Sequence, residues 1–113
     1  MNGFLAEADH YFDEMIGYYE SLIEQGRATA GTYYDLAGVY AFRGEVDIAM
    51  TNLRKFNQQE IFPRWWIEMF TRDPLFDNIR DKPEFQQILG DVETKYQAEH
   101  ERIRQWLQEN DML

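Results

Sequence analysis

The sequence contains no cysteine, which excludes disulfide bonds, thiolate catalysis and zinc sites built on cysteine. A chain without cysteine fits a reducing compartment, and we expect the protein to be cytoplasmic. Proline and glycine are also scarce, with three and seven among 113 residues. Together with 44% hydrophobic and 16% aromatic residues, this composition predicts one small helical domain with its own core.

Basic side chains are few. The chain has 11 Lys and Arg against 21 Asp and Glu, which gives a formal net charge of −10. Nucleic acids and anionic membrane surfaces are bound by basic faces, so we expect neither as a partner. No apolar run approaches the roughly 20 residues that cross a bilayer as a helix.

Apolar residues recur at intervals of three and four from Phe4 to Ile23, which predicts a first helix of about six turns. Gly26 is placed to end this helix, because the residue after a helix often needs a positive φ. A second helix is expected to begin near Gly31, capped by Thr29 or Thr32.

The second helix is expected to end near Arg43, and a third to run from about Val46 to Asn57, with Gly44 at the break between them. So short a connection predicts an antiparallel helical hairpin. The hairpin has an apolar face that another element must cover.

The hairpin carries a recognisable pattern. It reads Tyr33-x2-Leu36-Ala37-x2-Tyr40 and then Ala49-x3-Leu53, with Gly44 and Glu45 at the turn. This resembles the tetratricopeptide (TPR) repeat, a ~34-residue hairpin with the pattern W-x2-L-G-x2-Y, A-x3-F and P. Phe56 stands where a small residue is usual and the closing proline is displaced to Pro63, so the resemblance implies a repeat at the end of an array.

Residues 64–113 follow a different pattern. The stretch RWWIEMF predicts at most two helical turns, and Asp73-Pro74 begins a short helix. Asp81 is expected to cap a long final helix to about Asn110, with Glu84 completing a capping box. The spaced residues Asp73, Pro74, Arg80, Pro83, Phe85 and Leu89 resemble an ending that often follows TPR arrays. This resemblance implies the C-terminal tail of a longer bacterial signalling or regulatory protein.

In TPR proteins the first helix of each hairpin lines a groove that receives a peptide. The resemblance places Tyr34, Gly38, Ala41 and Phe42 at such positions. The Lys and Asn with which one TPR subset grips a terminal carboxylate are missing there, so an apolar or basic peptide is implied. The alternative is that Gly38 and Ala41 only leave room for the first or last helix of the same chain.

Trp65 and Trp66 point about 100° apart on a helix, so we expect one to anchor the short helix and the other to join a contact surface. The last helix would be ~40 Å long at 1.5 Å per residue, about twice the hairpin helices. Its end carries Ile103, Trp106 and Leu107. It is expected either to cap several helices or to pair with a second chain.

Two histidines support an alternative from another class. Glu7-x-x-His10 has the spacing of di-iron sites in helical bundles, but such a site needs a second copy and two more inward glutamates. His100 followed by Glu101 resembles the phospho-accepting His-Glu pair of sensor kinases, but no phosphotransfer or nucleotide-binding motif accompanies it. We expect His10 to be solvated and His100 to be partly buried and structural. A phosphotransfer or metal-binding bundle that uses His10 or His100 stays as the alternative.

The sequence therefore predicts an all-α fold of the α–α superhelix type. Residues 1–26 form an N-terminal helix, residues 30–63 a TPR-like hairpin, and residues 64–113 a capping segment with a long helix. No phosphate loop or nucleophile elbow is present, and we expect a non-catalytic module without a metal or cofactor. Its expected partner is a protein, a peptide or a second copy, unless the chain only caps a longer array. The predicted contact residues are Tyr34, Gly38, Ala41, Phe42, Trp65 and Trp66.

Overall fold

The computed structural model describes residues 2–112, except for the side chains of residues 2–6, and this part of the chain is helical without strands. The elements are α1 (Asn2–Glu24), α2 (Ala30–Phe42), α3 (Val46–Phe56), α4 (Arg64–Arg72), the 3-10 helix η1 (Pro74–Phe76) and α5 (Pro83–Glu109). The all-α prediction is confirmed. Phe4 and Leu5 of the first predicted stripe lie outside the described side chains.

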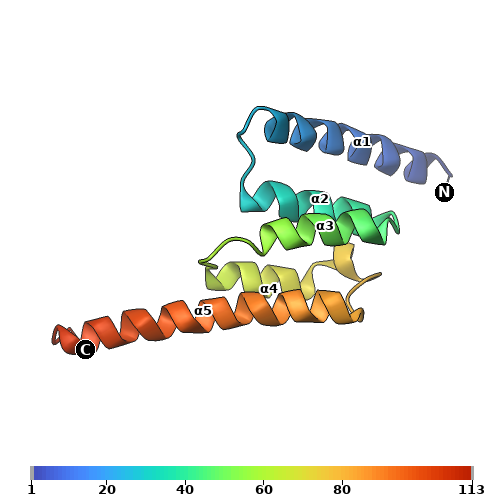
Figure 1. The fold of residues 1–113 in the computed structure, drawn as a ribbon. Helices are drawn as coiled ribbons and strands as arrows, with labels where there is room; N and C mark the ends of the chain where they lie inside the picture. Colours follow the sequence, from blue (N-terminus) through green and yellow to red (C-terminus); the bar gives the residue numbers. More distant parts are fainter. Residues whose placement is uncertain (1, 113) are drawn as a thin grey trace.

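The helices lie side by side in sequence order, with α1 at one side and α5 at the other (Figure 1). α1 packs on α2, and α2 and α3 form the central hairpin. η1 packs on α2, while α5 contacts both α3 and α4. The molecule measures 61 × 33 × 22 Å, and it is elongated because α5 continues well past the hairpin (Figure 1).

Two glycines end helices by the same local geometry. Gly26 has φ +69° and Gly44 has φ +80°, in the left-handed region that glycine enters without a Cβ clash. The next amide then reaches back five residues, from Arg27 to the Leu22 carbonyl and from Glu45 to the Tyr40 carbonyl. This is the Schellman type of helix end, and it confirms the predicted breaks.

The start of α2 is also set locally. The Thr29 hydroxyl accepts a hydrogen bond from the Thr32 amide, and the Thr32 hydroxyl accepts one from the Thr29 amide. Thr29 is thus the cap, and Thr32 takes the second role in the capping box. The predicted cap of η1 is confirmed as well, because Asp73 accepts from the Leu75 amide at 3.0 Å.

Two predicted boundaries in the second half need correction. The N-cap of α5 is Lys82 and not Asp81. No side chain caps this end, since a lysine ammonium has no acceptor for a backbone amide, and the predicted capping box with Glu84 does not form. α4 has nine residues instead of two turns. Its end is held by Arg80, whose guanidinium donates to the carbonyls of Phe70, Thr71 and Asp73.

The core is a cluster of aromatic rings between the hairpin and the second half of the chain. Tyr34, Phe56, Phe70, Phe76 and Phe85 are each 2% exposed or less, and neighbouring rings lie 4.8–5.9 Å apart in tilted or edge-to-face contacts. Edge-to-face pairs add to the burial of apolar area. The hairpin interface has small residues, since Ala37 and Ala49 are fully buried. Each major element except α1 therefore contributes a described ring or helix face to one core.

Candidate functional site

The space beside Gly38 is filled from within the chain. A Cβ atom added at Gly38 would lie 3.1 Å from Leu75 Cδ1 and 3.7 Å from the tip of the Phe76 ring. Tyr34 and Ala41 are 2% and 0% exposed. Buried residues cannot meet an external peptide, so the structure corrects the expectation of an open groove at these three positions. The space is occupied by η1, and not by the first or last helix as the sequence alternative had it.

Tyr34 has a structural role that its position in the core explains. Its hydroxyl donates to Asp73 Oδ2 at 2.9 Å, and the same carboxylate caps η1. Burial raises the pKa of Tyr34, and the hydrogen bond to Asp73 raises this pKa further. The hydroxyl therefore stays neutral and ties α2 to the segment that fills the space beside Gly38.

Phe42, the fourth predicted groove residue, is about half exposed. Its ring packs on Phe12 of α1, with centroids 5.4 Å apart. The Arg43 guanidinium lies over the same Phe12 ring at 5.9 Å. Phe42 thus has a neighbour inside the chain but keeps an open side.

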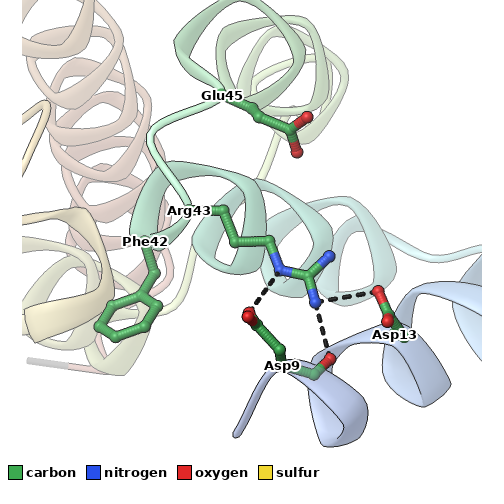
Figure 2. Close-up of a pocket in the computed structure, with 5 residues that line it drawn as sticks. All are labelled: Asp9, Asp13, Phe42, Arg43 and Glu45. Atoms are coloured by element: carbon green, nitrogen blue, oxygen red, sulfur yellow. Dashed lines mark hydrogen bonds and ion pairs between the residues drawn. The ribbon is translucent and has the colours of Figure 1, made fainter. Parts of the chain in front are cut away.

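Arg43 fastens α1 to the end of α2 (Figure 2). Its Nη2 atom lies 2.9 Å from Asp13 Oδ1 and donates to the Asp9 carbonyl at 2.7 Å. Nε is 3.5 Å from Asp9 Oδ1, which is close enough for an ion pair but too poorly aligned for a hydrogen bond. These residues line an open depression of about 570 Å³. Because two carboxylates already neutralise the cation, this depression does not favour an anionic ligand.

A second polar contact holds the other part of α1. The Tyr19 hydroxyl donates to Asp35 Oδ2 at 2.8 Å, and burial, followed by this bond, raises the pKa of Tyr19 to about 12. The Tyr40 hydroxyl donates to Glu20 at 3.3 Å. None of the described α1 side chains is fully buried. These polar contacts therefore add to the packing of the half-buried apolar side chains in the docking of α1.

The Tyr19 contact predicts a pH dependence. The folded state holds the Tyr19 proton more tightly than the unfolded state does. The contribution of this hydroxyl to the free energy of unfolding is therefore complete below pH 10 and is lost as pH rises from 10 towards 12. Tyr19 is partly exposed, so we expect about 1 kcal/mol rather than the roughly 2.7 kcal/mol of two full pKa units. Urea unfolding of Tyr19→Phe should show a stability deficit of that size at pH 8.

The deficit of Tyr19→Phe should narrow at pH 11, because the wild-type hydroxyl is then losing its advantage. Tyr18→Phe is the matched control, since the neighbouring Tyr18 ring is 63% exposed. A deficit of the same size at pH 8 and pH 11 would contradict this role of the hydroxyl.

The two adjacent tryptophans divide as expected. The Trp66 ring packs against Tyr34 and Phe56, with centroids 4.9 and 5.1 Å away. Trp65 stacks on Trp66 at 4.4 Å but is 55% exposed. Met69, one turn further on, is also exposed. The outer face of α4 therefore leaves Trp65 and Met69 open to solvent, while Trp66 anchors the helix.

Another open apolar feature lies on α5. Phe85, Ile88 and Val92 are 0–4% exposed, but Ile103 and Trp106 on the same side of the helix are 47% and 51% exposed. The last ties to the hairpin come from Lys95, whose ammonium donates to the carbonyls of Asn57 and Gln59. We refer to residues 97–109, which extend beyond these ties, as the projecting segment of α5 (Figure 1).

An open depression of about 500 Å³ lies where the projecting segment leaves the molecule. Arg64, Ile67 and Glu68 of α4 line one wall, and Tyr96 and His100 of α5 contribute to the other. Arg64 and Glu68 form an ion pair at 3.3 Å across one helical turn. The lining of the depression thus mixes apolar and charged side chains.

The two histidines do not come together. His10 is exposed on α1 and pairs with Glu14 at 3.0 Å. His100 is exposed on α5 and stacks on Tyr96, with ring centroids 5.9 Å apart. The expectation that His100 is partly buried is wrong, because the core ends before this part of α5. Within the described residues, no three His, Asp or Glu side chains are grouped as metal ligands would be.

The sequence reasoning gave no structural role to Arg43, Arg80 or Lys95. Each is a cation that binds carboxylates or backbone carbonyls of another element. The role of Lys95 could have been predicted from the sequence, because Lys95 falls between Val92 and Tyr96 on the apolar side of a helix. A charge at such a position indicates a buried partner.

None of the helices in the described residues is both long and apolar enough to cross a lipid bilayer. Comparison of the chain with protein-family models, with curated proteins and with solved structures gives no match.

Proposed function

We propose that this protein is a non-catalytic protein-interaction module built on a TPR-like hairpin. The carrying observation is the apolar side of α5, which the core covers as far as Val92 and leaves open at Ile103 and Trp106. Half-exposed Trp and Ile on a free helix are typical of contact surfaces. The exposed Trp65–Met69 face of α4 is a second surface of the same kind.

The TPR-like part of this proposal rests on the hairpin. Ala37 and Ala49 occupy the small-residue positions of the repeat pattern, and both are 0% exposed where α2 meets α3. The second pair, α4 and α5, follows the first in the same order, as in a helical repeat array. A role in a bacterial signalling or regulatory protein is proposed only from the motif that begins at Asp73.

The ionisable groups of the chain favour an architectural role over a catalytic one. The raised pKa values of Tyr19 and Tyr34 have burial as their largest cause, and both hydroxyls donate to a carboxylate of another segment. Asp35, whose pKa is also raised by burial, accepts the bond from Tyr19. These shifts thus accompany contacts that join helices.

Site-specific photo-crosslinking tests the interaction function. Benzoylphenylalanine placed at Ile103 or at Trp65, and activated in the cells that make the protein, should give discrete adducts of higher mass. The matched control is Gln87, which is exposed on the same helix but faces away from its apolar side. No adduct at Ile103 or Trp65, or equal adducts at Gln87, would contradict the proposal.

A further inference from the structure

We propose that the projecting segment of α5 pairs with the same segment of a second copy of this chain, in antiparallel orientation. The inference rests on the proposed function, since it names the occupant of the open surface at Ile103 and Trp106. The face is a direct continuation of the helix side that carries Phe85, Ile88 and Val92. In the first half of α5 this side packs on the chain's own core, and in the projecting segment it is free.

The charge distribution favours a second copy at this place. The projecting segment has three Glu (Glu99, Glu101, Glu109) and two Arg (Arg102, Arg104), which gives −1. The rest of the chain then carries −9 of the total −10. By contrast, residues 2–24 in α1 have six Asp and Glu and no Lys or Arg, which gives −6. Two copies can therefore approach through α5 with little repulsion, whereas two α1 faces would repel each other.

The same charges select the antiparallel orientation. In a parallel pair, two acidic cores of −9 would lie beside each other. In an antiparallel pair they lie at opposite ends of the 13 paired residues, ~20 Å apart along the helix at 1.5 Å per residue. Because the Debye length is about 8 Å at physiological ionic strength, that separation screens most of the repulsion.

The geometry defines a register. When the tip of one segment at Glu109 meets the start of the other at Gln97, the two-fold axis passes at Ile103. Trp106 then lies level with the partner's His100, next to the depression between α4 and α5. The surface is self-complementary, because one chain supplies both the protruding ring and the hollow, as an isologous contact requires.

The available area indicates a weak dimer. A Trp side chain buries about 150–250 Å² when fully covered, so the half-exposed Trp106 has roughly 100 Å² left to bury. With Ile103 and Leu107, the open apolar area of the projecting segment is roughly 200–300 Å² per copy. Stable interfaces bury about 1,200–2,000 Å² in total, of which some 60% is apolar. The contact thus falls below this range, where weak and transient interfaces lie, and we expect a dissociation constant of tens of micromolar or weaker.

Light scattering on size-separated protein over ~5–500 μM is the first test. The mass should rise with concentration from 13.6 kDa to twice that value. The substitutions Ile103→Ser and Trp106→Ser should raise the dissociation constant about tenfold or more, without changing the helical circular dichroism. Tyr18→Ser, which removes an equally exposed ring on α1, should leave the dimer unchanged.

Single cysteines then test the orientation, since the chain has none of its own. With a short bismaleimide, Ile103→Cys should crosslink two copies. Leu107→Cys should not, because in the antiparallel register the two copies of residue 107 are ~12 Å apart along the helix. A wild-type monomer at every concentration, a dimer insensitive to both serine variants, or crosslinking through Leu107→Cys would each overturn the inference. Photo-adducts from Ile103 to other proteins only would retain the interaction function while excluding the second copy.

Discussion

Replacing Phe70 by alanine is expected to lower the free energy of unfolding by about 3–5 kcal/mol. Phe70 is fully buried on α4, and its ring contacts Tyr34 of α2, Phe56 of α3, Phe76 of η1 and Phe85 of α5. Alanine would remove the one ring that touches every other element of the core and would leave a cavity there. Small domains are stable by only about 5–15 kcal/mol in total, so much of the stability depends on this side chain.

Urea unfolding followed by circular dichroism measures the effect of Phe70→Ala. With a denaturant slope of roughly 2 kcal/mol per molar, the midpoint should fall by about 2 M. Met69→Ala is the control on the same helix, because Met69 is 37% exposed and should cost less than about 1 kcal/mol. A similar small loss for both variants would show that the rings do not form one cooperative core.

Arg80→Ala is expected to cost about 2–3 kcal/mol, the second largest effect. The guanidinium donates to three carbonyls at the end of α4 and lies over the Phe85 ring at 5.7 Å. Without it, those acceptors stay in a partly covered position where water reaches only some of them. The contact with Asp77 at 3.4 Å is solvent-exposed and adds little.

The variant Arg80→Lys distinguishes the effect of the guanidinium geometry from that of the positive charge alone. A single ammonium cannot reach three carbonyls in different directions, so we expect lysine to recover less than half of the loss. Amide hydrogen exchange should also quicken in α4 and η1 more than in α2. The control is Arg54→Ala, whose exposed ion pair with Glu84 should be worth less than about 1 kcal/mol. Equal losses for Arg54→Ala and Arg80→Ala would contradict the role of Arg80 as the end of α4.

The helix ends could be predicted where the determining contacts are local. Gly26 and Gly44 adopt positive φ, and the Thr29–Thr32 and Asp73–Leu75 contacts span two or three residues. Helical angles also predicted that one of Trp65 and Trp66 would be an anchor and the other exposed, but only the structure shows that Trp66 is the anchor. Asp81 is not the cap because α5 begins at Pro83, one residue later than predicted, and Lys82 takes the N-cap position.

The candidate site was only partly predictable. Ile103 and Trp106 were placed on a helix that outruns the hairpin, and the structure shows them exposed. Whether the groove over Tyr34, Gly38 and Ala41 is open could not be predicted, because small residues leave space that either a ligand or another segment of the chain can fill. Leu75 and Phe76, more than 30 residues away in sequence, occupy that space.

The sequence by itself determined the all-α class, the hairpin and the helix ends, because spacing, capping and glycine conformation act within one or two turns. Only the tertiary structure decided which surfaces remain open. η1 fills the space beside Gly38, and Arg80 binds the carbonyls at the end of α4 from several residues away. The contacts between α5 and the hairpin extend no further than Lys95. Those outcomes depend on contacts between distant segments, and a periodic pattern such as that of α5 is the same whether its apolar side meets a core or the solvent.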